Sequence, residues 1–551
     1  MKIYIVLITI FTCFILPAEV SSQGRIQQEV RVVKPYSPTL SEANKINLLP
    51  VFNDTVRVVP DFGYKIFPKR FETQFRINEI KPGKMVGLPL TKLYKSQLTL
   101  GLGNYLTPLA ELTLNELRSR TTAMGLYLKH QSSTGKIKIE NGNKVDSDYS
   151  DNLARIYGKK MFYRSVIEGG ISGGYNSLLY YGYDPGIIDT ILLKPGIQQK
   201  IYSAGANIRY HSAYPDSFHF NYDLGLAYEL TSDRFKNTEN AFDLNTKFST
   251  MVKDASIGGD FRLRYYQPSE NLDSFSNLIV NIDPFFSKQS SEWRFLIGLI
   301  SAYDLRDQGT ISIYPRTEFQ FNIVQDVLIP YLGISGRREI NNYRKILLEN
   351  PYIRPGLRLK NTDYSLIGFV GLKGRYSSKL AFNLKASYSR AYNLYFFIND
   401  PADTLRNQFI AEYDNASITE LNAEVTWHPS DKIQLLFKSK YYQYDLVFLE
   451  KPWHRPLLEL SLSAGYNIKD KILIDGDVFY TGKRFAPGIT TLSEPIELKG
   501  FPDANLSVTY RYTKILSFFV KLNNFTSSSY QIWNQYPVQR FQFMAGFSYA
   551  L

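Results

Sequence analysis

The chain has 551 residues, a net charge of +13, 15% aromatic residues and a mean hydropathy of −0.23. A membrane protein built of several helices is excluded, because each span needs about 20 apolar residues and no second run after the amino terminus approaches that length. The single cysteine, Cys13, excludes a fold held together by disulfides.

The first 22 residues predict a secretory signal peptide. Lys2 supplies a positive charge, residues 3–16 are apolar and uncharged, and small residues follow Pro17. We expect cleavage near Gln23. The alternative is an amino-terminal membrane anchor, but the run is shorter than the ~20 residues of a spanning helix. Cys13 lies within this run, so the mature chain is expected to contain no thiol.

Residues 23–94 form a proline-rich segment with only short strand-like stretches, at 30–33, 56–59 and 71–77. Proline removes the backbone donor that a sheet ladder needs, so long strands are not expected here. We interpret the segment as an extended periplasmic or reduced plug-like region. A disordered linker is the alternative. The prolines are Pro35, Pro38, Pro50, Pro60, Pro68, Pro82 and Pro89.

From Lys95 to Leu551 apolar residues alternate with polar or small ones. Around residues 218–228 the odd positions are polar or small and the even positions are aromatic or leucine. The same period of two recurs at 382–388, 433–437, 458–462 and 506–512. A helix would repeat every 3.6 residues, so the pattern predicts β-strands.

The connections between these strands alternate in length. Short turns are expected near 253–254, 288–289, 325–326, 377–378, 430–431, 469–470 and 513–514. Longer loops are expected at 132–152, 182–198, 338–361, 399–406, 447–455, 484–500 and 526–538. Short turns on one side and long loops on the other are typical of a transmembrane antiparallel β-barrel, here of about 22 strands. Strand boundaries are least defined over 393–415. A soluble β-sandwich or propeller is the structural alternative.

The last residues carry an aromatic stripe on alternate positions up to the terminus, including Phe547, Tyr549 and Leu551 after Gly546. A closing barrel strand with one face toward lipid explains such an ending. Together with Leu522-Asn-Asn-Phe525, Tyr530, Trp533 and Tyr536-Pro537, this stretch resembles the final hairpin of TonB-dependent receptor barrels.

The resemblance implies a 22-stranded outer-membrane barrel. It also implies that Gly546, Phe547, Tyr549 and Leu551 act as a signal for the barrel-assembly machinery. The sequence departs from the family where Val538-Gln539-Arg540 replaces the usual Gly-Arg, and where leucine replaces the usual terminal phenylalanine. The amino-terminal segment is also shorter than the family's plug.

A short stretch near the amino terminus looks like the box that passes a strand to TonB. Edge-strand addition suits an extended segment of this kind. Valine-rich pentapeptides are nevertheless common, so this assignment is an expectation only. The residues are Glu29, Val30, Arg31, Val32 and Val33.

Basic residues fall on the positions that alternate with the lipid-facing ones. A charge facing lipid at mid-bilayer would cost about 2–4 kcal/mol, so we expect these residues to face the lumen. A cationic lumen would favour anionic solutes; neutralisation by inward acids such as Asp260, Asp475 and Asp477 is the alternative. The candidate lumen cations are Arg262, Arg264, Lys373, Arg375, Lys385, Lys438, Lys440, Arg511 and Lys521.

No catalytic, cofactor or metal site is expected. The five histidines lack metal-ligand spacing, and a Ser217–His219 pair has no third partner. The glycine-rich stretch 168–174 follows a strand pattern, so kinks in a curved wall explain it better than a phosphate loop. Trp293, Trp427, Trp453 and Trp533 lie near expected strand ends and suit interfacial anchoring.

Two functions remain open from the sequence. The first is solute transport across the outer membrane of a Gram-negative cell, and the second is a scaffold role in an envelope-assembly or secretion complex. Expected partners are outer-membrane lipid and lipopolysaccharide, the barrel-assembly machinery, and TonB or another periplasmic protein. Nucleic acid is not expected as a partner, and the substrate is not indicated.

Overall fold

The computed structural model describes residues 94–551, apart from 117–118, 120, 140–141, 184–195, 215–219, 273–275, 307–308, 325–326, 358 and 489–493. The predicted signal peptide, the TonB-box-like residues Glu29 to Val33 and nearly all of the proline-rich segment lie outside the described residues. His219 of the serine–histidine pair also lies outside them.

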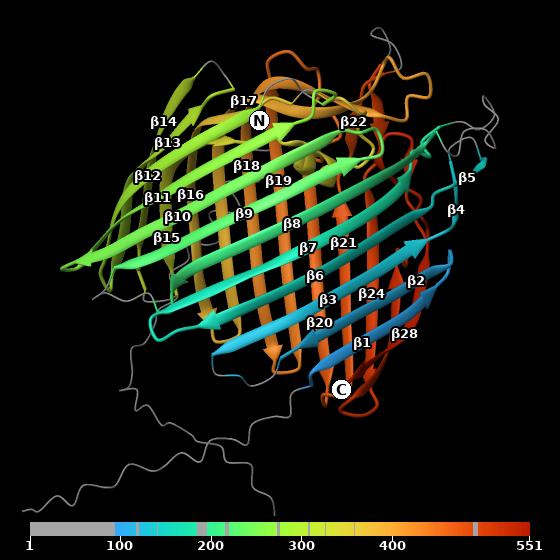
Figure 1. Cartoon of the computed structure of the whole chain (residues 1–551), viewed down its shortest axis with the longest axis horizontal. Helices are drawn as coiled ribbons and strands as arrows, with labels where there is room; N and C mark the ends of the chain where they lie inside the picture. The colour runs from blue at the N-terminus through green and yellow to red at the C-terminus, as the bar shows by residue number, and fades with distance from the viewer. Residues whose placement is uncertain are drawn as a thin grey trace, which may run out of the picture. The chain divides into compact units, whose positions relative to one another are not determined.

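The described chain forms one closed antiparallel barrel of 22 strands (Figure 1). Each strand pairs with the next along the wall, and the last, β28, pairs with both β25 and β1. This confirms the predicted fold class and strand number. The wall strands are β1 (Ser96–Gly103), β2 (Thr107–Asn115), β3 (Thr122–Ser133), β6 (Tyr149–Met161), β7 (Ser165–Leu179), β8 (Gln198–Ser212), β9 (Asn221–Asp233), β10 (Thr238–Val252), β11 (Ala255–Pro268), β12 (Asn277–Gln289), β13 (Trp293–Asp304), β14 (Thr310–Phe321), β15 (Ile329–Glu339), β16 (Thr362–Ser377), β17 (Leu380–Asn399), β18 (Phe409–Ser430), β19 (Ile433–Leu446), β20 (Leu458–Ile468), β21 (Ile472–Thr481), β24 (Phe501–Arg511), β25 (Leu516–Asn523) and β28 (Gln542–Ala550).

Alternation along each strand separates two faces of the wall. Along the middle of β13 and at the start of β14 one face carries exposed apolar side chains, with Ile297, Leu299, Ile311 and Ile313 between 50% and 67% exposed. The positions between them face the opposite way, as the pleat of a strand requires. An apolar outer face on a closed barrel is the arrangement that lets strands cross a bilayer with every edge paired.

The longest connections all lie at the same end of the barrel. One end carries short turns such as 253–254, 378–379 and 431–432, and it also holds the start of β1 and the end of the chain, where the Ser96 amide donates to the Leu551 carbonyl at 2.9 Å. The other end carries the long connections 134–148, 180–197, 340–361, 482–500 and 524–541. We call these the short-turn end and the loop end.

The loop end also holds the remaining secondary structure. This consists of the helix α3 (Tyr343–Glu349) and three short hairpins: β4 (Lys136–Lys138) with β5 (Lys144–Asp146), β22 (Arg484–Ala486) with β23 (Ile496–Leu498), and β26 (Gln531–Trp533) with β27 (Tyr536–Pro537). Among the described residues, no helix has the length and apolar character needed to span a membrane.

The stretch 393–415, whose boundaries the sequence leaves open, forms the tip of the β17–β18 hairpin. The pairing shifts between Ala391 and Leu394, and Asn393 takes a φ of +53° at this irregularity. Beyond it, Tyr395, Phe396 and Phe397 are all buried although they are consecutive. Both faces of the hairpin are covered there, so the alternation that marks the other strands disappears.

Candidate functional site

The loops at the loop end pack into a common aromatic core, which we call the loop cap. It comprises the β17–β18 tip and residues 180–183, 340–357, 359–361, 447–457, 482–488, 494–500 and 524–541. At its centre the rings of Tyr352 and Tyr536 stack with centroids 3.7 Å apart, and Tyr181 meets the ring of Tyr536 edge-on at 4.9 Å. Tyr343, Phe409 and Tyr536 are each at most 2% exposed. The loops therefore form a folded layer with its own core.

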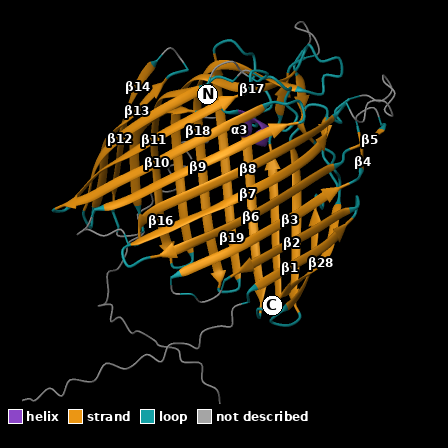
Figure 2. Ribbon diagram, viewed as in Figure 1, coloured by secondary structure: helices purple, strands orange, loops and turns teal. Residues whose placement is uncertain are grey.

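The helix α3 is held against the wall by two carboxylates. The Glu239 carboxylate of β10 accepts bonds from the Tyr343 amide at 2.8 Å and the Asn342 side chain at 2.8 Å. The Tyr343 hydroxyl donates to Asp233, the last residue of β9, at 2.6 Å. Figure 2 shows the helix in purple at the upper end of the barrel. Residues 340–361 are thus folded toward the wall instead of projecting outward.

Hydrogen bonds between loops distant in sequence join the rest of the cap. The Tyr180 hydroxyl donates to the Ile353 carbonyl at 3.0 Å, and the Asn407 side chain donates to the Tyr180 carbonyl at 2.8 Å. Ile353 also forms a parallel bridge with Phe409. Because these groups are buried, each bond replaces one that water would otherwise make.

His454 is a buried histidine that forms hydrogen bonds to two other segments of the cap. Its Nδ1–H donates to the Phe397 carbonyl at 2.7 Å, and its Nε2 accepts from the Asn534 amide at 3.2 Å. These partners require the neutral ring. Burial, together with the nearby Arg484 charge, lowers the pKa of His454 to about 4, although the bond to Phe397 acts in the opposite direction. The ring is therefore uncharged at neutral pH.

A pocket of about 680 Å³ opens between the β4–β5 hairpin and the loops around β24 and β28. Three basic side chains, Lys138, Lys499 and Arg540, line it together with the acid Glu497, which pairs with Lys483 at 3.6 Å. We call this the basic pocket. The other residues that line it include Phe501, Pro502, Ser528, Ser529, Tyr530 and Gln531.

The basic pocket has one rigid aromatic wall. Phe501 and Tyr530 stack with centroids 3.6 Å apart and planes 6° from parallel. The Arg484 guanidinium lies 5.4 Å from the Phe501 ring centre and donates to the backbone carbonyl of Ile532 at 2.7 Å. Burial lowers the pKa of Arg484 to about 10. The Tyr530 hydroxyl donates to Asp503 at 2.7 Å, which fixes the ring.

The candidate lumen cations occupy the strand faces opposite the exposed apolar side chains. Arg262 lies 3.9 Å from Asp260 and 3.8 Å from Asp283, and Lys438 lies 4.0 Å from Glu424. Arg264 donates to Asn281 at 2.9 Å. These contacts support partial neutralisation by inward acids, the alternative that the sequence leaves open.

Three further candidate cations lie over aromatic rings. Lys373 lies 5.3 Å from the Tyr331 ring centre, Lys385 lies 4.9 Å from that of Phe369, and Lys521 packs similarly over Phe519. Lys373 and Lys385 come from the paired strands β16 and β17, whereas Lys521 comes from β25. The remaining candidates, Arg375, Lys440 and Arg511, occupy the same face of β16, β19 and β24.

The terminal strand closes the barrel at a point of close backbone approach. Gly546 lies opposite Gly101 of β1 and Phe519 of β25. A side-chain carbon at Gly546 would lie 2.2 Å from the Leu100 carbonyl oxygen. Phe547 and Tyr549 lie on the face of β28 opposite Gly546, and Leu551 follows the strand and is exposed. The use of these residues as an assembly signal remains a prediction.

Several residues that organise the cap give no signal in the sequence. Asp233 and Tyr343 are 110 positions apart, and His454 stands alone in a loop. Trp453 and Trp533 lie in the cap, where Trp453 is buried and Trp533 packs against Phe397 and Phe409, so the interfacial role expected for these two was wrong. In the described part of the chain no three histidine, cysteine or acidic side chains are grouped as a metal site would require.

Solved structures share this barrel. The siderophore receptor PirA from Acinetobacter baumannii matches with a TM-score of 0.64 and 10% identity, over 84% of this chain and 81% of that chain. The ferric-catecholate import receptor Fiu from E. coli K12 matches with a TM-score of 0.60 and 9% identity, over 83% and 82%. The fold is that of a TonB-dependent receptor barrel.

The copper transporter OprC shares this receptor-barrel fold, with a TM-score of 0.60 and 11% identity over 83% of this chain and 80% of that chain. No protein-family model matches the sequence, and no curated protein is similar to it. At such low identity the likeness concerns the fold. The matched proteins are described as receptors and transporters, not as enzymes.

Proposed function

We propose that this receptor-like barrel takes up a solute across the outer membrane, and that the basic pocket is where the solute first binds. The observation that carries the proposal is the convergence of Lys138, Lys499 and Arg540 with the fixed Phe501–Tyr530 stack around about 680 Å³. Clustered cations raise the local concentration of anions. A flat aromatic wall favours a ligand with planar rings.

An anionic metal chelate with aromatic groups is the solute class that best fits this pocket. The proteins of the same fold include receptors described for ferric catecholates and siderophores. Such a ligand would combine negative charge for the three basic side chains with rings that contact Tyr530, since Phe501 is only 7% exposed beneath it. The pocket volume lies within the range of small-molecule sites, about 300–1,000 Å³.

Equilibrium binding tests this assignment. Purified full-length protein is titrated with a ferric catecholate complex, and quenching of intrinsic fluorescence reports binding. The triple substitution Lys138→Gln, Lys499→Gln and Arg540→Gln should weaken binding about 100-fold, as expected when three charge-assisted contacts are lost. The matched control substitutes Lys253, Lys432 and Lys514, which are exposed at the short-turn end. Equal affinity of the unchanged protein, the triple variant and the control variant would reject the basic pocket as the binding site.

Residues 23–94 are proposed to act as a reduced plug, with Glu29, Val30, Arg31, Val32 and Val33 passing a strand to TonB. Signal cleavage near Gln23 would leave this segment at the mature amino terminus. Conductance in planar bilayers, compared with and without residues 23–94, should rise on deletion. An unchanged conductance would reject the plug and favour the scaffold role, in which the segment binds an assembly partner.

A further inference from the structure

One stretch of the barrel wall is held together by side chains instead of backbone hydrogen bonds. β14 and β15 pair only over four residues, Thr317–Gln320 with Tyr331–Ile334. Across the other side of β14 the pairing with β13 is complete, from Trp293 to Asp304 against Thr310 to Phe321. Between these four pairs and the loop end, the described residues of β14 and β15 are therefore not paired with one another.

The seam on the other side of the same hairpin is also interrupted. β12 pairs with β13 at Ile279–Val280 and again from Phe285, but not over residues 281–284. Ser301 fills the interval: its hydroxyl donates to the Ile282 carbonyl at 2.8 Å and its amide donates to Asp283 at 3.1 Å. The β13–β14 hairpin is thus fully paired within itself and attached to both neighbours by fewer backbone bonds.

The unpaired stretch of β14 carries apolar side chains on its outer face, whereas that of β15 is polar. Ile311 and Ile313 of β14 are 67% and 66% exposed, while residues 335–339 of β15 are Ser-Gly-Arg-Arg-Glu and the Arg337 side chain is 57% exposed. In hydrocarbon, an unpaired strand edge is costly, because no water is present to bond with it. The two strands nevertheless stay close, since a side-chain carbon at Gly336 would lie 2.6 Å from the Tyr314 ring.

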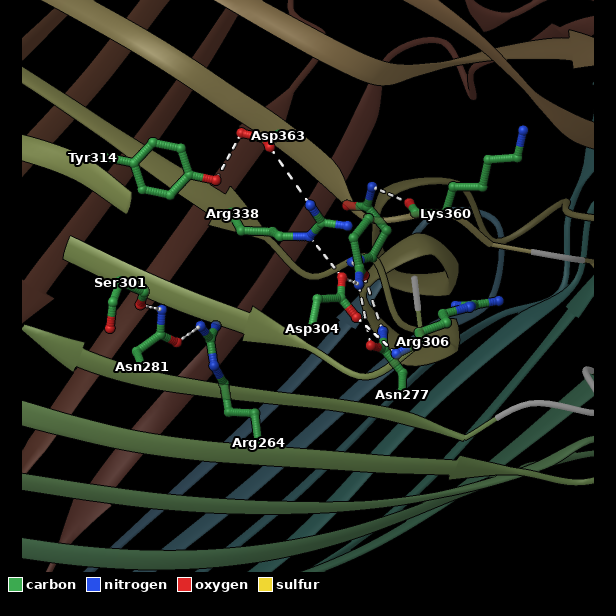
Figure 3. A network of polar contacts seen from close by, with 12 residues as sticks. Arg264, Asn277, Asn281, Ser301, Asp304, Arg306, Tyr314, Arg338, Lys360 and Asp363 are labelled. Carbon is green, nitrogen blue, oxygen red and sulfur yellow. Dashed lines mark hydrogen bonds and ion pairs between the residues drawn. The ribbon is translucent and has the colours of Figure 1, made fainter. Parts of the chain in front are cut away.

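A buried polar cluster bridges this seam on the inner side. Arg338 of β15 donates from Nε to Asp304 at the end of β13 at 2.6 Å and from Nη1 to Asp363 of β16 at 3.5 Å. Tyr314 of β14 donates to the same Asp363 at 2.8 Å (Figure 3). We call Asp304, Tyr314, Arg338 and Asp363 the latch. Its bonds run from both strands of the hairpin to both strands beyond the seam.

We propose that the loop-end half of the β14–β15 seam is a lateral port, held shut by the latch, that admits the hydrocarbon chain of an amphiphile from the surrounding leaflet. A hydrocarbon chain suits Ile311 and Ile313 on the β14 side, whereas Arg337 on the β15 side and the latch offer charged and hydroxyl groups to a polar head. Opening requires breaking side-chain contacts and few ladder bonds. This inference does not depend on the solute proposed for the basic pocket.

Site-specific fluorescence tests the port. Ser312 lies on β14 in the unpaired stretch and faces the same way as Tyr314; Ser203 of β8 is the control, because its strand pairs continuously with both neighbours. Full-length protein with Ser312→Cys or Ser203→Cys carries a bimane label and is reconstituted into phosphatidylcholine vesicles. The quencher is phosphatidylcholine with a nitroxide on its acyl chain.

The latch variant combines Asp363→Asn with Tyr314→Phe. Quenching at position 312 should increase about two-fold or more in this variant, because locally weak units open first, while quenching at position 203 stays unchanged. No increase at 312 in a protein that keeps its folded, heat-modifiable migration would overturn the proposal. An equal increase at both positions would also overturn it, since that result means general loosening. Arg338→Lys, which keeps the charge and loses the planar fork, repeats the test if the double variant does not fold.

Discussion

The imidazole of His454 and the backbone of Phe397 are joined by a buried hydrogen bond of 2.7 Å in which the ring nitrogen is the donor. The second ring nitrogen accepts from Asn534. One neutral histidine therefore connects the loop 447–457 to the β17–β18 tip and to the loop 524–541. Protonation would convert the acceptor into a donor that faces another donor.

The cap should lose stability as the pH falls from about 6.5 to about 4. The pKa of His454 is lowered to about 4 in the folded cap, so the opened cap binds the proton first and is favoured over this interval. The free energy that favours the closed cap falls by up to roughly 3 kcal/mol over this interval, and it has its full value above pH 6.5. Tryptophan emission recorded against pH would report the change through Trp453 and Trp533.

His428→Gln is the control for this pH dependence, because His428 is exposed near the short-turn end. It should leave the emission curve in place, whereas His454→Gln should flatten it between pH 6.5 and 4. If the His454 variant keeps the full transition, another group is responsible.

Removing the Tyr343 side chain should release the segment 340–361 from the wall. Tyr343→Ala deletes a fully buried ring and its bond to Asp233, a loss of about 3–5 kcal/mol for the seated loop. Trypsin should then cut after Arg344 or Lys345 at least ten times faster than in the unchanged protein, since local opening exposes these sites.

Leu348→Ala provides the comparison on the same helix, because Leu348 is 74% exposed. Its digestion rate should match that of the unchanged protein. Equal protection of Tyr343→Ala and Leu348→Ala would show that the helix is not seated by Tyr343.

The wall of the barrel was predictable because the pattern of each strand depends on that strand's own residues. A strand with one face in lipid and one in the lumen alternates side chains with a period of two, and stretches such as 506–512 show this period without help from distant residues. The difference in length between loops and turns then gave the order of the strands. Counting these elements was enough to predict a barrel of about 22 strands.

The cap was not predictable from the same pattern. Residues 394–397 are buried on both faces, so their sequence has no alternation to read. In the sequence, Trp453 and Trp533 look the same as tryptophans that anchor a barrel at the membrane interface. Only the packing of distant loops against one another places these two residues in the cap. The β14–β15 seam does leave a sign in the sequence, because Pro315 lies in the unpaired stretch of β14 and has no amide hydrogen to give to a ladder.

Gly546 should be intolerant of any side chain. Gly546→Ala places a carbon 2.2 Å from the Leu100 carbonyl oxygen and 2.7 Å from the Gly101 Cα, and both neighbours are backbone atoms that cannot rotate away. We expect a cost of at least about 1–3 kcal/mol at the junction of β1 and β28, with less heat-modifiable barrel recovered from membranes.

Gly368→Ala is the matched substitution, because a carbon at Gly368 meets nothing within 4 Å. It also replaces a strand glycine, in β16, and should assemble normally. Similar yields of both variants would indicate that β1 and β28 separate more readily than the paired register implies.

The loop end should face outward and the short-turn end should face the periplasm. Ser529 lies in the loop 524–541 and Ser378 in the turn 378–379, and both are exposed. Cys13 is the only natural cysteine, and the predicted signal cleavage removes it, so single cysteines at these sites can be labelled without background. In intact cells a membrane-impermeant maleimide should modify Ser529→Cys and leave Ser378→Cys unmodified until the outer membrane is permeabilised. Labelling of Ser378→Cys alone in intact cells would reverse the orientation, and it would place the basic pocket on the periplasmic side, where it could not receive a solute from outside.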